Sequence, residues 1–367
     1  LDLLVTGSLN NIANPAAFVY RNTGDGTFAN INAGLRGVMN GSAAWVDFDN
    51  DGNLDASLSG DPYLGSFNAS LLYRNTGAGG FVETATGMAD VSLGAVTWGD
   101  YDNDGDADAL VLGSVRVELA LPYNATAIYR NDGRISATAW RFTNIGAGVA
   151  ALSQGDADWA DYDGDGDLGF AILGNFGSSD PRALVYRNDA GTFVEAAALP
   201  GLSQGKLAWG DYDRDGDVDL VYGGGDGAGL RTVLYRNDAD TNGARSFSAS
   251  GQSLSGSRWG DVAWGDLDGD GALDLAVAGN GSTLQTLIYR NNGCGPDAAI
   301  SATGPLYPVL QNTPLSVTVL VSNTGSMDAA GVVITSLLPA GSSNVVCAAS
   351  GAGVCAIAGG QVNVSYA

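Results

Sequence analysis

The chain has 367 residues, a formal net charge of −24 and only 16 Lys plus Arg, which argues against a nucleic-acid partner because phosphate binding requires a basic face. It contains no His, so Ser-His-Asp and Cys-His catalysis and His-liganded zinc are excluded. No hydrophobic run reaches the roughly 18 residues that a membrane-spanning helix needs, so we expect no membrane span in this sequence.

An acidic motif, Asp-x-Asp-x-Asp-Gly, occurs five times along the chain, each time two residues after a Trp. The copies are Asp47–Gly52, Asp100–Gly105, Asp161–Gly166, Asp211–Gly216 and Asp266–Gly271. Alternating carboxylates on a tight turn, with Gly where the backbone reverses, are the oxygen-rich ligands that Ca²⁺ requires. Two carboxylates about 4 Å apart repel by about 4 kcal/mol at an effective dielectric constant of about 20, so a cation is the simplest reason to gather them. The alternative is a solvated acidic turn, which five copies in one register disfavour.

The predicted calcium ligands are the side chains at loop positions 1, 3, 5 and 9 and the backbone carbonyl of position 7. They are Asp47, Asp49, Asp51, Asn53 and Asp55 in the first loop; Asp100, Asp102, Asp104, Asp106 and Asp108 in the second; Asp161, Asp163, Asp165 and Asp167 in the third; Asp211, Asp213, Asp215, Asp217 and Asp219 in the fourth; and Asp266, Asp268, Asp270, Ala272 and Asp274 in the fifth. The third loop has Gly169 at position 9. We therefore expect about five Ca²⁺ sites, with the third the weakest.

The residues around these loops indicate β-hairpins rather than EF-hands. An EF-hand needs a bidentate Glu at position 12 and a helix on each side. Position 12 is instead apolar or aromatic, as Leu58, Val111, Ile172, Tyr222 and Val277. The flanking segments are short, rich in β-formers and bounded by Gly, so each loop is predicted to join two strands, with position 12 in a buried strand.

A second motif, Tyr-Arg-Asn, recurs in step with the acidic loops. Its six copies begin at Tyr20, Tyr73, Tyr129, Tyr186, Tyr235 and Tyr289, and a Gly-containing turn usually follows. The acidic loops are 50 to 61 residues apart, which is enough for four strands of about 5–6 residues with their turns. The sequence therefore predicts an all-β fold, a β-propeller of four-stranded blades. Six blades are visible with the terminal ones incomplete, and Asp2 stands in the position-9 slot of the first; the intact protein would have six or seven.

The combination of Trp, acidic loop and Tyr-Arg-Asn resembles the FG-GAP/VCBS repeat family, whose calcium loops also occur in the propeller of integrin alpha subunits. The resemblance covers about residues 1–291. It implies a propeller with calcium in the loop that joins the first and second strands of each blade. Gly169 departs from the family pattern, as do Asn53 and Ala272, which would still offer a backbone carbonyl. A WD40 propeller is a poorer match because its Gly-His signature needs a His.

The composition changes at about Cys294, where the acidic loops end and Ser, Thr, Val and Gly dominate. The segments LSVTVLVSNTG, GVVITSLLPAG and QVNVSYA alternate like strands of a sandwich. They resemble an Ig-like repeat of unknown function that is common on prokaryotic surfaces. We therefore expect a propeller at residues 1–293 and a partial Ig-like β-sandwich at 294–367.

Three Cys are too few for a disulfide scaffold. Cys347 and Cys355 lie eight residues apart between strand-like segments, a spacing that would allow a disulfide across a hairpin. Cys294 would then be left over. Three free thiols are the alternative.

Catalysis has little support in the sequence, and we expect no enzyme. Paired carboxylates could in principle hydrolyse glycosides, yet nearly all the close pairs are accounted for as calcium ligands. The three Glu, at positions 83, 118 and 195, recur at no shared place in the repeat. The repeated Trp is predicted to be propeller core rather than a platform for sugars.

Ligand recognition is the favoured function. Because strands alternate in direction, the loops between second and third strands emerge on the face opposite the calcium loops, and these loops vary most. They span residues 8–17, 61–70, 114–126, 175–182 and 224–231, and their candidate exposed aromatics are Tyr63, Phe67, Tyr123 and Phe176. We expect a calcium-binding, non-catalytic propeller of a secreted or cell-surface protein that binds a protein or glycan there in adhesion or recognition. The alternatives are a carbohydrate-binding, lectin-like propeller and the non-catalytic part of a larger extracellular enzyme.

Overall fold

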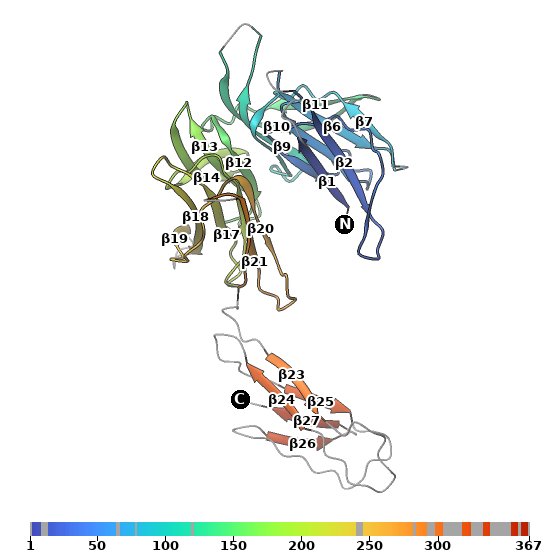
Figure 1. Ribbon diagram of the computed structural model, residues 1–367, viewed down its shortest axis with the longest axis vertical. Helices are drawn as coiled ribbons and strands as arrows, with labels where there is room; N and C mark the ends of the chain where they lie inside the picture. Colours follow the sequence, from blue (N-terminus) through green and yellow to red (C-terminus); the bar gives the residue numbers. More distant parts are fainter. Residues whose placement is uncertain are drawn as a thin grey trace. The chain divides into compact units, whose positions relative to one another are not determined.

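The computed structural model describes only part of the chain in detail, and every element in that part is a β-strand (Figure 1). The described residues are 2–8, 14–63, 67–77, 79–118, 121–239, 245–281, 284–291, 298–303, 318–323, 333–337, 354–358 and 361–365. Within them, no helix is long and apolar enough to cross a bilayer. The predicted all-β class is confirmed.

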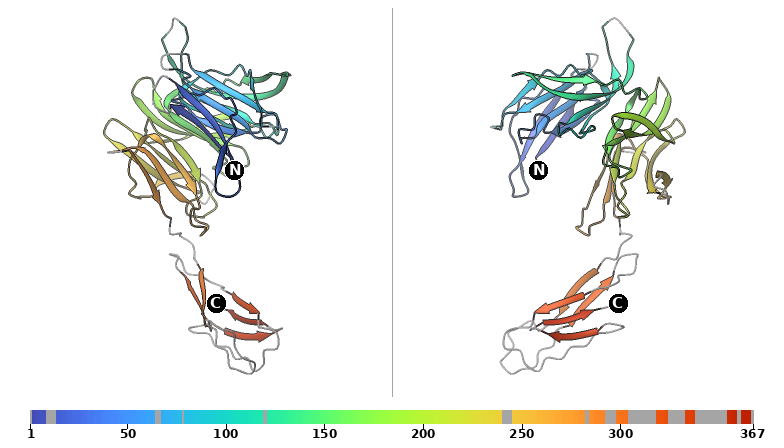
Figure 2. Two further views of the ribbon diagram at one scale, coloured as in Figure 1. Left: turned by 45° about the vertical axis from the view of Figure 1, so that its right-hand side comes forward. Right: turned by 180° about the vertical axis from the view of Figure 1, so that it is seen from behind.

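Six antiparallel sheets, called blades 1 to 6 below, are arranged as a β-propeller (Figures 1 and 2). Blade 1 consists of β1 (Leu3–Ser8), β2 (Pro15–Asn22) and β3 (Phe28–Asn30); blade 2 of β4 (Ala43–Val46), β5 (Asp55–Gly60), β6 (Ala69–Asn75) and β7 (Phe81–Thr84); and blade 3 of β8 (Ser92–Gly99), β9 (Asp108–Val115), β10 (Tyr123–Ser136) and β11 (Ala139–Asn144). Blade 4 consists of β12 (Leu152–Ala160), β13 (Gly169–Phe176), β14 (Asp180–Asp189) and β15 (Thr192–Leu199); blade 5 of β16 (Leu207–Gly210), β17 (Asp219–Gly225), β18 (Leu230–Ala239) and β19 (Arg245–Ala249); and blade 6 of β20 (Arg258–Gly265), β21 (Asp274–Asn280) and β22 (Leu284–Tyr289). Successive strands pair side by side in every blade, so the predicted propeller is confirmed.

The chain divides into two compact units. The first comprises Leu1–Tyr212, Gly216–Gly265 and Leu273–Tyr289, and the second comprises Asp213–Asp215, Asp266–Ala272 and Arg290–Ala367. Towards the C-terminus, β23 (Ala298–Thr303) pairs with β24 (Thr318–Asn323), and β27 (Gln361–Ser365) lies between β25 (Val333–Leu337) and β26 (Val354–Ala358). The Ig-like resemblance of this part stays a prediction. Cys294 and Cys347 lie outside the described residues, and so does the predicted disulfide to Cys355.

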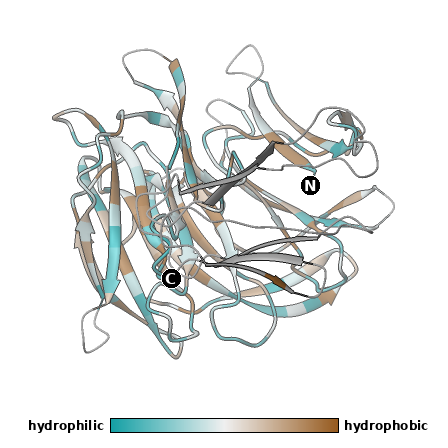
Figure 3. Cartoon of the chain, turned by 90° about the horizontal axis from the view of Figure 1, so that it is seen from below, coloured by the Kyte–Doolittle hydropathy of each residue, from teal (hydrophilic) through white to brown (hydrophobic). Residues whose placement is uncertain are grey.

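The core lies between blades, where apolar positions alternate with hydrophilic ones along the strands (Figure 3). The five residues at loop position 12 are at most 1% exposed, which confirms that they belong to buried strands. They are Leu58, Val111, Ile172, Tyr222 and Val277. Burial of such side chains is the main favourable contribution to folding, at about 1.5–3 kcal/mol each.

The repeated Trp packs across the boundary between blades. Tyr101, at position 2 of the second acidic loop, stacks on Trp159 of the next blade with ring centroids 6.3 Å apart. Tyr162 stacks in the same way on Trp209, at 5.8 Å. Trp159 is only 8% exposed and lies in the core cluster of blades 3 and 4. The predicted core role of the Trp is confirmed, and in three blades it couples the preceding acidic loop to the next blade.

The start of each first strand requires Gly because the backbone of the second strand lies against it. A Cβ on Gly155 would overlap the carbonyl oxygen of Leu173, and the corresponding Gly41, Gly94, Gly205 and Gly260 meet the same obstacle. The blade therefore has no room for any side chain at this position.

Replacing Gly155 tests this close approach. We expect Gly155→Ala to lower the free energy of unfolding by at least about 2 kcal/mol, because backbone must move to admit the methyl group. Gly229→Ala is the matched control, since a Cβ there meets nothing within 4 Å. Chemical denaturation of the three proteins measures the difference. Equal losses of stability in both variants would contradict the steric explanation.

Candidate metal centres

Each acidic loop joins the first and second strands of a blade, as predicted. The first loop connects β4 to β5, and these strands pair in antiparallel register from Ala43 with Leu58 to Val46 with Asp55. The residue at loop position 6 has a φ between 83° and 96° in all five loops, a conformation that favours Gly. The Gly of the motif is thus explained by the turn that returns the chain to the second strand.

The carboxylate at position 1 is fixed by backbone amides of its own loop. In the first loop, Asp51 N donates to Oδ1 of Asp47 at 3.1 Å and Gly52 N donates to Oδ2 at 3.0 Å. The amides at positions 5 and 6 make the same bonds to Asp100 in the second loop and to Asp161 in the third. The loop is therefore folded around its first carboxylate.

The carboxylate at position 9 is the most deeply buried of the set. Asp55 has no exposed surface, and it accepts hydrogen bonds from Phe48 N at 3.2 Å and from Asn75 N at 2.6 Å. Asp108 is equally buried and accepts from Tyr101 N and Asn131 N. Burial raises the pKa of each carboxyl to about 7, because the ionised form loses its hydration. A cation held against these oxygens would offset that cost.

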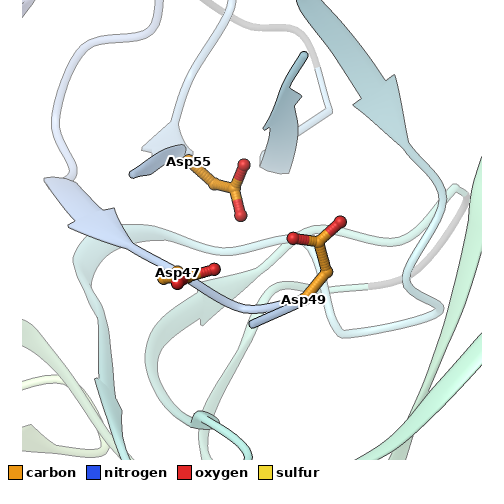
Figure 4. A group of neighbouring side chains, drawn as sticks. All are labelled: Asp47, Asp49 and Asp55. Carbon is orange, nitrogen blue, oxygen red and sulfur yellow. The ribbon is translucent and has the colours of Figure 1, made fainter. Parts of the chain in front are cut away.

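The loops bring together three carboxylates each, and Figure 4 shows the first such set, Asp47, Asp49 and Asp55. In every set, one oxygen from each residue lies within 4.8 Å of the others. Positions 1, 3 and 9 make up the sets of the first, second, fourth and fifth loops, as Asp47, Asp49 and Asp55; Asp100, Asp102 and Asp108; Asp211, Asp213 and Asp219; and Asp266, Asp268 and Asp274. The third set is Asp161, Asp163 and Asp165, from positions 1, 3 and 5.

Positions 5 and 7 have other hydrogen-bond partners in the first two loops. Asp51 Oδ1 accepts from Asn53 N at 2.9 Å, and Asp104 Oδ1 accepts likewise from Asp106 N. The side chain of Asp106 accepts from Asn50 Nδ2, at position 4 of the preceding loop, at 2.7 Å. Ligation by position 5 and by the carbonyl of position 7 stays a prediction.

The third loop differs because its position 9 has no space for a carboxylate. A Cβ on Gly169 would lie 2.6 Å from the carbonyl oxygen of Tyr186 and 2.8 Å from a ring carbon of Tyr162. The set that remains, Asp161, Asp163 and Asp165, therefore has no contribution from the buried second strand. This geometry supports the prediction that the third site is the weakest.

The donor set fits a hard divalent cation. Oδ1 of Asp49 is buried and has no hydrogen-bond partner in the part of the chain that the structure describes. Burial, together with the charge of Asp51, raises the pKa of Asp49, so a positive charge at this oxygen would be stabilising. The guanidinium of Arg74, from Tyr-Arg-Asn, lies 4.0 Å from Oδ2 of Asp49. Carboxylate and carbonyl oxygens suit Ca²⁺ or Mg²⁺ rather than zinc or copper.

The Asn of Tyr-Arg-Asn joins the acidic loops of adjacent blades. Asn131 Nδ2 donates to the carbonyl of Ala107 in its own loop at 3.2 Å and to that of Phe48 in the preceding loop at 2.9 Å. Asn188 and Asn237 make the equivalent pairs of bonds. Sequence reasoning missed this role, although the recurrence of Asn in step with the loops was its signal.

The comparisons agree with this geometry. A family model described as an FG-GAP-like repeat matches residues 161–222 and 211–277. The matched segments include the third, fourth and fifth acidic loops, and the first two loops share the positions that gather carboxylates. No curated protein matches the chain. The propeller part of the predicted resemblance is therefore supported by both sequence match and fold.

Removing the bridging amide tests the link between loops. We expect Asn131→Ala to lower the free energy of unfolding by about 1–3 kcal/mol, because two buried carbonyls lose their donor. Asn22→Ala is the control: Asn22 holds the same motif position in blade 1 but is exposed. Denaturant titration should separate the variants. A smaller loss in Asn131→Ala than in Asn22→Ala would refute the bridging role.

The ranking of the sites can be tested with equivalent substitutions. Asp100→Asn and Asp161→Asn each remove the carboxylate at position 1. The loop of Asp100 has a buried Asp at position 9, and the loop of Asp161 has Gly169 there. We expect Asp100→Asn to lose more of the calcium-dependent rise in melting temperature. An equal or greater loss in Asp161→Asn would show that Gly169 does not weaken the third site.

Proposed function

We propose that the chain is a non-catalytic β-propeller, stabilised by Ca²⁺ at its acidic loops, of a secreted or cell-surface protein that acts in adhesion or ligand recognition. The calcium part of the proposal rests on the recurrence of one carboxylate arrangement in successive blades. In four of the five loops, the Asp at position 9 is at most 3% exposed. Hard oxygen donors in this number suit calcium at extracellular concentrations. The match to FG-GAP-like repeats supports the same assignment.

The energetic contribution of calcium would be large. At millimolar calcium and a dissociation constant of about 10⁻⁴ M, each site adds about 1.4 kcal/mol to stability. Five such sites would contribute about 7 kcal/mol, which is comparable to the ~5–15 kcal/mol stability of a whole domain. The propeller would then be well folded only where calcium is plentiful, as it is outside cells.

Chelation therefore provides the first test. We expect the melting temperature to fall when the purified protein is moved from millimolar calcium to a chelator, with a change in tryptophan fluorescence because each loop adjoins a packed Trp. Sodium chloride at matched ionic strength, without calcium, is the control for ionic strength. A melting temperature that does not move would mean that the loops are solvated turns.

The recognition part of the proposal depends on the face opposite the acidic loops. All four aromatic candidates there are exposed, Tyr63 at 60%, Phe67 at 57%, Tyr123 at 53% and Phe176 at 45%. Tyr63 and Phe67 lie on the connection from second to third strand of blade 2, Tyr123 begins the third strand of blade 3, and Phe176 ends the second strand of blade 4. Exposed aromatic rings on a rigid scaffold are typical of binding surfaces for proteins and glycans.

Hydrogen bonds between neighbouring blades hold these connections in place. Asn124 Nδ2, in blade 3, donates to the carbonyls of Asn175 and Gly177 in blade 4 at 2.9 and 3.0 Å. Asn68 Nδ2 donates to the carbonyl of Ser114 in the same manner between blades 2 and 3. The Arg182 guanidinium lies 4.3 Å from the centre of the Phe176 ring. The surface is thus preorganised, which lowers the entropic cost of binding.

A lectin-like role is the second candidate, and the recurrence of exposed aromatics in consecutive blades favours it. Sugars stack their apolar faces on such rings. Binding to a glycan array in calcium, lost in the Tyr63→Ala/Phe176→Ala double variant, would support it. Ile135→Ala is the matched control, since Ile135 is 58% exposed at the other end of blade 3. Binding that survives the double variant would place recognition elsewhere.

A further inference from the structure

A cavity of about 400 Å³ lies among the first strands of five blades. These strands, β4, β8, β12, β16 and β20, each form an edge of their sheet, and neighbouring ones contact one another. Backbone bonds fix their mutual position: Gln204 N donates to the carbonyl of Gln154 at 2.5 Å, and Trp259 N donates to that of Gln204 at 2.7 Å. We call this space the axial cavity. Its volume is in the range of sites for small organic ligands.

The charges of the axial cavity are confined to three blades. Two equivalent positions of each first strand line it, and they are Ser42 and Ala44, Ala95 and Thr97, Asp156 and Asp158, Lys206 and Ala208, and Asp261 and Ala263. Blades 2 and 3 thus contribute small, uncharged side chains. Blades 4 to 6 contribute three carboxylates and one ammonium group. The wall formed by blades 2 and 3 is therefore uncharged and lined by small side chains, whereas the wall formed by blades 4 to 6 has an excess of negative charge.

Lys206, the only Lys in the chain, forms an ion pair with one of the three carboxylates, and its charge also acts to lower the pKa of the other two. Its Nζ lies 2.9 Å from Oδ1 of Asp156. The other oxygen of Asp156 accepts a hydrogen bond from Leu207 N at 3.1 Å, so this pair is well satisfied. The three carboxylates outnumber this one ammonium group, so the charge that remains in the cavity is negative.

Asp158 and Asp261 carry that remaining charge. Oδ1 of Asp158 accepts from Trp159 N at 3.0 Å, and the Thr97 hydroxyl also bonds this carboxylate. Oδ1 of Asp261 accepts from Val262 N at 2.9 Å. Burial, followed by the charge of Asp156, raises the pKa of Asp158 to about 7, and burial raises that of Asp261. Both ionised groups are under-compensated by their surroundings.

The arrangement does not resemble a metal site. Among the described residues, the acidic groups that gather oxygens within 4.8 Å are those of the five loops, and the axial carboxylates are not one of them. The remaining lining is largely small and aliphatic. Aliphatic walls accommodate methylene groups. Carboxylates on blades 4 and 6, in a cavity to which blades 2 and 3 contribute small, uncharged side chains, suit an elongated organic cation.

We propose that the axial cavity binds an aliphatic diamine or a related alkylammonium compound, with ammonium groups at Asp158 and Asp261 and the alkyl chain against the apolar wall. This site is distinct from the acidic loops, and it does not depend on calcium except through the stability of the fold. Recognition is by charge-assisted hydrogen bonds, which are stronger than neutral ones.

Calorimetric titration with 1,4-diaminobutane and with spermidine, in millimolar calcium, tests the proposal. We expect saturable binding of at least one amine, weakened about tenfold or more in Asp158→Asn and in Asp261→Asn. Asp180→Asn is the control, since Asp180 is an exposed partner of Arg182, and it should bind like the unsubstituted protein. Absence of amine binding up to 10 mM, or equal affinity in all variants, would overturn the proposal, as would saturable binding of a neutral sugar that both Asn variants abolish.

The stability of Asp158→Asn separates a binding role from a structural one. A carboxyl whose pKa is higher in the folded than in the unfolded chain destabilises the fold as the pH rises through the folded pKa. Removing the charge should therefore maintain or raise the melting temperature at pH 8 while amine binding falls. Asp156 on β12, Thr97 on β8 and Lys206 just before β16 act on this carboxyl, and Asp261 on β20 lines the same cavity. A lower melting temperature together with unchanged amine affinity would assign Asp158 to the fold alone.

Discussion

Burial of a carboxylate at position 9 of the acidic loop is the constraint on which the repeat depends. Asp55 and Asp108 are removed from water entirely, and each ties two separate parts of its blade by accepting amides from the loop and from the third strand. Two hydrogen bonds do not replace the hydration of a full charge. The converging carboxylates of positions 1 and 3 make the charge excess larger. A bound cation would resolve the excess and would turn a repulsive cluster into a centre that holds the first three strands together.

The consequences extend from one blade to the next. The position-2 Tyr of the second, third and fourth loops stacks on the following Trp, and the position-4 Asn of the first and second loops donates to the loop of the next blade. In the opposite direction, Asn131 Nδ2 donates to the carbonyl of Phe48 in the preceding loop. Each loop is therefore shaped partly by its neighbours, so an ion bound in one should stabilise the blades on both sides. This coupling explains why Trp, acidic loop and Tyr-Arg-Asn recur together.

Much of this could be predicted from the sequence because the signals are local and repeated. Alternating apolar residues, turn residues and the apolar position 12 predict the hairpins. The sequence also predicts Asp2 at position 9 of its loop, and Asp2 accepts a hydrogen bond from Asn22 N at 2.8 Å, as Asp55 does from Asn75 N. The bridge from Asn131 to Phe48 was not foreseen, since it joins residues 83 apart in sequence. Nor was the axial cavity, because Asp158, Lys206 and Asp261 are isolated in sequence and meet only when the blades close around an axis. The crowding at Gly169, likewise, depends on the ring of Tyr162.

The stoichiometry of bound calcium tests the central claim most directly. Equilibrium dialysis of metal-free protein against millimolar calcium, followed by elemental analysis, should give about five ions per chain, the number of carboxylate sets. Asp49→Asn, which removes the buried oxygen that lacks a hydrogen-bond partner, should lower that number by one. Less than one ion per chain at saturation would contradict the account, because the buried carboxylates would then have to be tolerated without a metal.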